Sequence, residues 1–244
     1  MTEPVFLAPL DAPAVGATVT LTGQEGHHAA AVRRIKVGEV VCISDGNGTA
    51  VRGAVTAADK GSISVLVDEV LREPARPVRY VAVQALPKGD RAELAVEMLT
   101  ELGIDEIVPW QASRSVVRWS PERTERGLTR WRAAAREASK QSRRLRVPTV
   151  SLPMTTAELA LRIDQTALTV ILHESASLPL ATIDLPASGE IMFIVGPEGG
   201  LSDDEVAAFE KAGGRPVLVA DAVLRTSTAG VVALAQLQAM SARD

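Results

Sequence analysis

Phe193-Ile194-Val195-Gly196-Pro197-Glu198-Gly199-Gly200-Leu201-Ser202 is a short apolar run that leads into a glycine-flanked turn. The apolar residues predict a buried strand that ends abruptly, because glycine permits a positive φ and proline fixes its own φ. Ser202 followed by Glu205 predicts a capping box and a helix over 203–212, which the next two glycines would stop. The stretch therefore predicts a strand, a tight turn and a helix start, an arrangement that can bind a ligand.

The charge of this corner limits what it can bind. A helix N-terminus attracts anions, but Asp203, Asp204 and Glu205 would oppose a second negative group in the first turn. No Lys-Ser or Lys-Thr follows the glycines, as a phosphate-binding P-loop requires, and the spacing is not that of a dinucleotide fingerprint. The corner suits a neutral or cationic ligand; an ordinary capped turn is the alternative.

The composition is that of a soluble globular protein with one or two domains: 244 residues, 46% hydrophobic and 23% charged. We expect neither a signal peptide nor a membrane span, which needs an apolar run of about 18 residues. Cys42 is the single cysteine, which excludes an internal disulfide and favours the cytoplasm. With three histidines in the chain, we expect no metal site.

Positive charge is concentrated in one segment. Between Arg114 and Arg146, eleven basic residues face three acids, so this segment carries +8 in a chain of net charge −4. The asymmetry favours binding of a polyanion, most plausibly nucleic acid, over the alternative of a solvated helix face. The residues that we expect to contact RNA are Arg114, Arg123, Arg130, Lys140, Arg143 and Arg144, together with Arg33 and Arg34 earlier in the chain, which could also face only water.

The N-terminal part reads as short β-like runs at 18–21, 37–44, 49–55 and 62–70. Asp45-Gly46-Asn47-Gly48 predicts a hairpin turn between two of them, and the whole predicts a small barrel-like module. The stretch 26–34 predicts a short helix. Its adjacent residues His27 and His28 lie on different helix faces, which favours structural or RNA-facing roles over metal binding.

A proline-stiffened linker at 72–77 predicts the domain boundary, and strands and helices alternate after it. Strands at 80–86 and 107–108 with a helix at 91–102 between them predict a mostly parallel sheet flanked by helices. Ser120-Pro121 predicts the start of a long helix to about residue 142. Within it Trp131 should face the core, which leaves Trp119 as the better candidate for stacking on a base.

Polar or glycine-rich residues follow three predicted strands: after 167–172, at Gly196 to Gly200, and after 216–219. In open α/β sheets ligands bind beyond the carboxyl ends of strands, so these three ends are candidate binding loops. The third leads to Thr226, Ser227 and Thr228, whose hydroxyls could cap a helix reaching about residue 240. Capping does not explain Arg225 beside them.

Several blocks occur in an order that is specific as a set: Gly26-His27-His28 through Arg34, Asp45-Gly46-Asn47-Gly48, Thr100-Glu101-Leu102-Gly103 with Pro109, Gln141-Ser142-Arg143-Arg144 with Val147-Pro148, Gly196-Pro197-Glu198-Gly199-Gly200, and Leu224-Arg225-Thr226 with Thr228-Ala229. On these blocks nearly the whole chain resembles the bacterial RsmE-type uridine-N3 methyltransferases of small-subunit ribosomal RNA. These belong to the SPOUT class of knotted methyltransferases.

The resemblance implies an α/β protein with a PUA-like RNA-binding β-barrel over 1–73 and a SPOUT trefoil-knot domain over 74–244. It implies that the chain forms a homodimer through the knotted domain, binds S-adenosylmethionine, and methylates N3 of a specific uridine in 16S rRNA of the small ribosomal subunit. The positive sulfonium fits the acidic helix start at 203–205. The cofactor-binding residues that it implies are Leu172, His173, Glu174, Gly196, Glu198, Gly199, Gly200, Val219, Val223, Leu224, Thr226, Thr228 and Ala229.

The sequence departs from the family pattern near the cofactor loops. Val219-Ala220 stands where Leu-Gly is expected, Ala222 where Arg is usual, and Ser227 where Glu is usual. Earlier in the chain, Glu97-Met98 replaces an expected Gln-Lys. These differences bear on the roles of individual residues more than on the activity.

Methylation of uracil N3 requires removal of its proton, so it needs a base or a group that stabilises the deprotonated ring. Arg225 is the candidate for stabilising negative charge on the uracil. Glu198 is the candidate for accepting the proton or orienting the base, with a turn-stabilising carboxylate as an equal alternative. The target must be unpaired or flipped, because N3 lies on the pairing edge. Two other functions stay open: a related knotted methyltransferase acting on ribose 2'-oxygen or another base, and a non-catalytic RNA-binding assembly factor.

Overall fold

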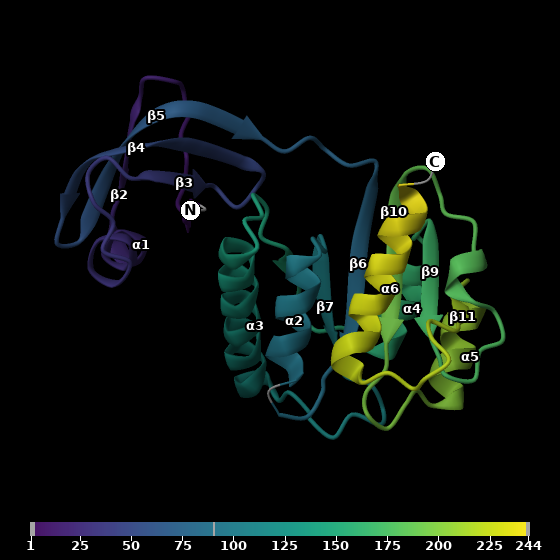
Figure 1. Ribbon diagram of the computed structural model, residues 1–244. Coiled ribbons are helices and arrows are strands. Elements are labelled where there is room, and N and C mark those ends of the chain that lie inside the picture. Colours follow the sequence, from purple (N-terminus) through teal and green to yellow (C-terminus); the bar gives the residue numbers. More distant parts are fainter. Residues whose placement is uncertain (1–2, 90, 243–244) are drawn as a thin grey trace. The chain divides into compact units, whose positions relative to one another are not determined.

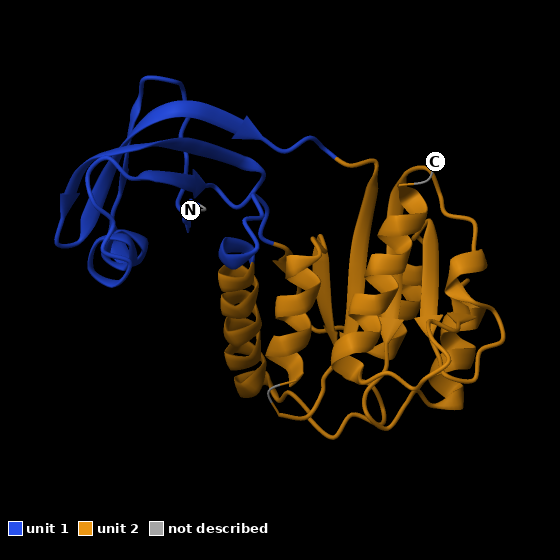
Figure 2. Cartoon of the chain, viewed as in Figure 1, with its two compact units in different colours: residues 1–75, 139–147 blue, residues 76–138, 148–244 orange. Residues whose placement is uncertain are grey.

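The computed structural model describes residues 3–89 and 91–242, and the chain divides into two compact units (Figure 2). Unit 1 comprises Met1–Ala75 and Ser139–Val147, and unit 2 comprises Arg76–Ala138 and Pro148–Asp244. The domain boundary expected between residues 73 and 74 stays a prediction, and the grouping of 139–147 with unit 1 was not anticipated. None of the helices in the described ranges is both long and apolar enough to cross a membrane.

Unit 1 is built on a five-stranded mixed sheet with the order β1-β3-β4-β5-β2 (Figure 1). The four expected strands are present, and β1 is an additional one that pairs in parallel with β3. The expected short helix is a helical turn continued by a π-helical turn, η1. The elements are β1 (Val5–Leu7), β2 (Thr18–Leu21), α1 (Gly23–His27), η1 (His28–Val32), β3 (Val40–Ser44), β4 (Thr49–Asp59) and β5 (Ser62–Arg72).

The expected hairpin turn joins β3 to β4, which pair antiparallel. Gly46 and Gly48 adopt φ of 75° and 100°, the left-handed region that favours glycine. Asp45 closes the turn with its own side chain, because Oδ1 accepts hydrogen bonds from Asn47 N at 2.7 Å and Thr49 N at 3.0 Å. The Asp-Gly-Asn-Gly signal in the sequence is therefore confirmed.

The turn at 45–48 also binds residues 145–147, which belong to the second segment of unit 1. Gly48 N and Ser44 Oγ both donate hydrogen bonds to Leu145 O, at 3.0 and 2.8 Å, and Val147 N donates to Gly46 O at 2.9 Å. These contacts join residues about 100 positions apart in the chain. Residues 145–147 thus form part of the fold of unit 1.

Unit 2 contains a six-stranded sheet in which every strand is parallel, with the order β11-β9-β10-β6-β7-β8. The expected parallel sheet with flanking helices is confirmed, while the strand order alone does not define a knot, so the trefoil knot stays a prediction. The strands are β6 (Val78–Ala85), β7 (Glu106–Trp110), β8 (Thr149–Val150), β9 (Leu168–Leu172), β10 (Gly189–Val195) and β11 (Arg215–Val217). The helices are α2 (Arg91–Glu101), α3 (Pro121–Gln141), α4 (Thr156–Ile163), η2 (Leu180–Thr182), α5 (Asp203–Lys211) and α6 (Thr226–Ser241).

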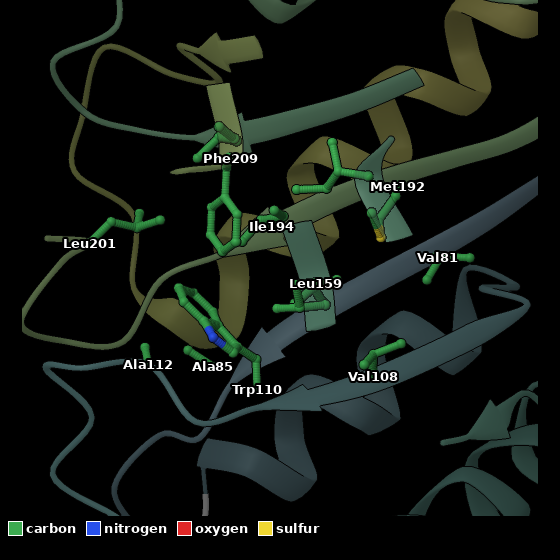
Figure 3. Close-up of a cluster of buried hydrophobic side chains, with 13 residues drawn as sticks. Val81, Ala85, Val108, Trp110, Ala112, Leu159, Met192, Ile194, Leu201 and Phe209 are labelled. Atoms are coloured by element: carbon green, nitrogen blue, oxygen red, sulfur yellow. The ribbon is translucent and has the colours of Figure 1, made fainter. Parts of the chain in front are cut away.

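Side chains alternate along the central strands of this sheet and bury both of its faces. On one face Met192 and Ile194 of β10 belong to a cluster in which the rings of Trp110 and Phe209 meet edge to face at 5.3 Å (Figure 3). On the other face α6 approaches β10 closely at Gly230, where an added Cβ would lie 3.1 Å from Val195. Helices on both sides therefore fix β10, the strand that carries the glycine corner.

The starts of α3 and α5 follow the sequence signals. α3 begins at Pro121 as expected, and Trp131 is buried as predicted, together with Leu128, Ala135 and Ala138. α4 and α5 begin with complete capping boxes, formed by Thr155 with Glu158 and by Ser202 with Glu205.

Candidate active site

The carboxyl ends of β11, β9 and β10 lie at one edge of the sheet, because β9 pairs in parallel with both of the others. The loops that follow these strands surround a cavity of about 270 Å³ and an adjoining hollow of about 70 Å³. The structure thus brings together the three strand ends that the sequence singled out, as the general rule for open parallel sheets predicts.

Most residues of the predicted cofactor set line these spaces. The larger cavity is lined by Leu172, Glu174, Gly196, Glu198, Gly200, Val223, Leu224, Thr226 and Ala229, together with the catalytic candidate Arg225. His173 and Val219 line the smaller hollow. Gly199 and Thr228 line neither: Gly199 packs against Arg114, and Thr228 Oγ1 donates a hydrogen bond to Arg225 O at 3.1 Å. Their cofactor contacts stay predictions without support from the cavity.

The hydroxyls at the start of α6 do not cap it as expected. The N-cap residue is Arg225, which makes no side-chain capping bond. Thr226 Oγ1 instead donates to Gly196 O at 2.8 Å and accepts from Gln84 Nε2 at 3.0 Å. The capping prediction was wrong because an oxygen acceptor from the neighbouring glycine corner lies within reach of this hydroxyl. The resulting relay links β6, the corner and α6.

Glu198 is held by the loop that follows β6. Its Oε1 accepts a hydrogen bond from Lys88 N at 3.0 Å and lies 3.9 Å from Arg91 Nη1. The bond to a backbone amide is what the turn-stabilising alternative predicts, and the residue also lines the cavity. The geometry is compatible with both expected roles.

The acidic start of α5 does not face the cavity. Burial opposes ionisation of Glu205, but hydrogen bonds from the backbone N–H groups of Ser202 and Ser113 outweigh it and lower the pKa of this carboxyl. None of residues 203–205 is among those that line either space. The expected match between this helix start and a sulfonium thus has no support from the cavity lining and stays a prediction, and Glu174 and Glu198 are the carboxylates that line the cavity.

Sequence reasoning missed several residues of this site. Arg91 lines the cavity, and Gln84 supports Thr226 from β6. Both were overlooked because only three strand ends were compared, whereas β6 also pairs in parallel with β10 and ends at the same edge. Arg114 braces the glycine corner, since its Nη1 donates to Leu201 O at 2.8 Å and Gly199 O at 3.4 Å.

The predicted RNA contacts differ in exposure. Arg33, Arg34, Arg123, Arg130 and Arg143 are exposed and Arg144 is half-buried, so their roles stay predictions. The structure corrects the prediction for Lys140, which is 6% exposed. Its Nζ lies 3.1 Å from Glu25 Oε1 and 3.3 Å from His28 Nδ1, so the ammonium is buried in unit 1 rather than presented to a phosphate.

Two family models match the chain, and they define its class. An RNA methyltransferase domain model matches residues 74–238, and an RNA methyltransferase PUA domain model matches residues 21–68. The chain is therefore an RNA methyltransferase with a PUA domain.

Full-length relatives narrow this class to one family. The Mycobacterium tuberculosis ribosomal RNA small subunit methyltransferase E is 42% identical over 95% of this chain and 90% of its own length. The Bacillus subtilis protein of the same name is 30% identical over 90% and 89%. The Neisseria gonorrhoeae structure, solved bound to S-adenosyl methionine, matches with a TM-score of 0.86 and 28% identity over 98% of both chains. The chain belongs to the ribosomal RNA small subunit methyltransferase E family.

Proposed function

We propose that this chain transfers a methyl group from S-adenosylmethionine to N3 of a specific uridine in 16S rRNA of the small ribosomal subunit. The observation that carries the proposal is the cavity at the strand ends, which gathers nine of the residues expected to hold the cofactor in a chain 42% identical to a curated family member. The target is unpaired or flipped, because N3 takes part in base pairing.

The lining of the cavity fits this cofactor. Leu172, Leu201 and Leu224 provide apolar walls for a flat ring system, while Glu174 and Glu198 place carboxylates where a cationic centre can be accepted. Bound S-adenosylmethionine would supply a methyl group activated by its sulfonium. The loops that line the cavity would position the acceptor for transfer of that methyl group.

Arg225 and Glu198 have different roles at the uracil in this proposal. The guanidinium of Arg225 has no hydrogen bond or ion pair within the described residues, and the residue lines the cavity, so it is free to stabilise the charge left when N3 loses its proton. Glu198 accepts that proton or orients the ring, and Lys88 N together with Arg91 holds its carboxylate in place.

The enzyme acts as a homodimer through its methyltransferase unit in this proposal. Large apolar side chains of unit 2 are exposed in the single chain, among them Leu161 at 71% and Val223 at 80%. Exposed apolar side chains are common on surfaces that a partner covers. We place the enzyme in the cytoplasm, where its free, buried thiol at Cys42 stays reduced.

The test is methyl transfer by the purified chain to small subunits from a strain that lacks the corresponding gene, followed by nucleoside mass spectrometry. One N3-methyluridine per 16S rRNA is expected. Arg225→Gln should lower kcat by about 10²-fold or more with an unchanged dissociation constant for S-adenosylmethionine. A product methylated on ribose 2'-oxygen would identify a different target atom, and no product would refute the proposal.

A further inference from the structure

Unit 2 has a second large hollow whose lining shares no residue with the candidate active site. We call it the α3 groove; its volume is about 690 Å³, and it is lined by Val117, Arg118, Trp119, Arg123, Glu125, Arg126, Thr129 and Arg130. Four arginines face one glutamate in this lining. The surface is therefore electropositive and suits an anionic partner.

Trp119 is held rigidly at this groove. Its ring meets Trp131 edge to face at 5.5 Å, and its backbone N–H donates to Gln111 Oε1 at 2.9 Å. It also lies over Gly127, where an added Cβ would overlap its Cζ2. Trp119 is half-buried, whereas Trp131 is 1% exposed. A fixed, partly exposed indole can stack on a base at little entropic cost.

The arginines of the groove differ in how far they are neutralised. Arg118 Nη2 donates to Ser113 O at 3.2 Å, and Arg130 Nε lies 3.5 Å from Glu93 Oε1. Arg123 and Arg126 are exposed, and their guanidiniums make no hydrogen bond or ion pair across residues 3–89 and 91–242. Two unpaired cations beside an indole provide the charge and stacking that single-stranded nucleic acid requires.

A third hollow shares lining residues with the active-site cavity and is lined by chain neighbours of residues at the groove. It measures about 540 Å³ and shares Arg91 and Glu198 with the cavity. It is also lined by Val116, the chain neighbour of Val117 in the groove, and by Leu94, the neighbour of the Glu93 that pairs with Arg130. The groove therefore lies near this hollow, and the hollow shares two residues with the cavity at the glycine corner.

We propose that the α3 groove binds an unpaired stretch of the RNA substrate, with a base stacked on Trp119 and neighbouring phosphates on Arg123 and Arg126. The strand then continues past Val116 toward the cavity, so the groove contributes to the choice of the nucleotide that reaches Arg225. This inference rests on the proposed function and adds a binding subsite to it.

The first test compares two double variants of the full chain for binding of a short fluorescein-labelled oligouridylate. Arg123→Gln with Arg126→Gln removes two groove charges, and Lys211→Gln with Arg215→Gln is the control, with the same charge change at exposed residues of α5 and β11. In the groove variant the plot of log K against log salt should flatten by about 1.4, since each phosphate contact to a single strand contributes about 0.7. The control should leave the slope near that of the wild type, and S-adenosylmethionine affinity should stay unchanged in both.

The second test uses tryptophan fluorescence of the wild-type chain. Trp110 and Trp131 are 0% and 1% exposed, so quenching by added RNA reports on Trp119. We expect quenching that Trp119→Phe abolishes, and about a 5-fold or greater loss of RNA affinity in Trp119→Ala. Trp119→Ala removes packing on Trp131 and could fail to fold. In that case the fluorescence of the wild-type chain and the salt slope of the double arginine variant test the proposal.

Unchanged salt slopes in the groove variant, or no response of Trp119 to RNA, would overturn the proposal. A concentration-dependent change of Trp119 emission without RNA, unaffected by RNA, would identify the groove as a contact between two copies and would also overturn it. Methyl transfer by the same wild-type preparation distinguishes failure of the proposed function from failure of the proposed subsite. If transfer occurs while the groove tests fail, only the subsite is wrong.

Discussion

Replacement of Thr226 by valine tests how far the glycine corner depends on one hydroxyl. Thr226 is 6% exposed, donates to Gly196 O at 2.8 Å and accepts from Gln84 Nε2 at 3.0 Å. Valine keeps the shape of the side chain but removes both hydrogen bonds. The variant therefore isolates the relay that joins β6, the corner and α6.

The expected cost follows from the groups that lose a partner. Each hydrogen bond contributes about 1 kcal/mol net, and a buried polar group left without a partner costs about 1–3 kcal/mol. Gln84 Nε2 keeps its bond to Ala85 O at 3.1 Å, which limits the loss on that side. We expect the free energy of unfolding to fall by about 2 kcal/mol. If the displaced corner also costs the cofactor about 2 kcal/mol of binding free energy, the dissociation constant of S-adenosylmethionine would rise by about 30-fold.

Thr226→Ser is the matched control, because it keeps the hydroxyl and removes one methyl group, worth about 0.8 kcal/mol. Urea unfolding measures the stability of both variants, and isothermal titration calorimetry measures cofactor affinity. The reasoning is refuted if the valine variant binds the cofactor as well as the serine variant, since the hydroxyl would then not position the corner.

Three further predictions concern stability and packing. Glu106 is buried, but hydrogen bonds from arginine and serine side chains outweigh that burial and lower its pKa to about 2. Its stabilising contribution is therefore present above about pH 4.5 and is lost as the pH falls toward 2. In Glu106→Gln, the midpoint of urea unfolding should depend less on pH across this range. Gly26→Ala would place a Cβ 2.5 Å from Leu21 O, and the midpoint of urea unfolding should report a loss of about 1–3 kcal/mol, with no loss counting against this packing. Gly127→Ala should push the indole of Trp119 outward and shift the emission to longer wavelength, whereas an unchanged spectrum would contradict the close approach.

Features encoded within a few residues could be predicted from the sequence. Asp45 to Gly48 specify a hairpin because their side chain and glycine conformations act locally. Ser202 with Glu205 similarly specifies a helix start, since both partners lie within one turn. The position of the candidate site followed from a topological rule, which needs only the order of strands and loops.

Features that depend on contacts between distant segments could not be predicted. Lys140 lies among arginines and was expected to be a surface cation. Its ammonium instead binds Glu25, which is 115 positions away in the sequence, and is buried in unit 1. Thr226 was expected to cap the helix, because the acceptor that its hydroxyl binds instead, Gly196 O, is 30 positions away in the sequence. Gln84 gave no signal, because a single polar residue at the end of an apolar strand acquires meaning only from its neighbours in the sheet.

The return of residues 139–147 to unit 1 has a consequence for biosynthesis. During translation residues 1–75 emerge first, yet the Asp45 to Gly48 turn obtains its partners Leu145 and Val147 only about 100 residues later. Closing so long a loop is slow compared with forming a local hairpin. The first unit to leave the ribosome is thus completed only after much of the second has been synthesised, and a fragment ending at residue 75 would lack part of its own structure.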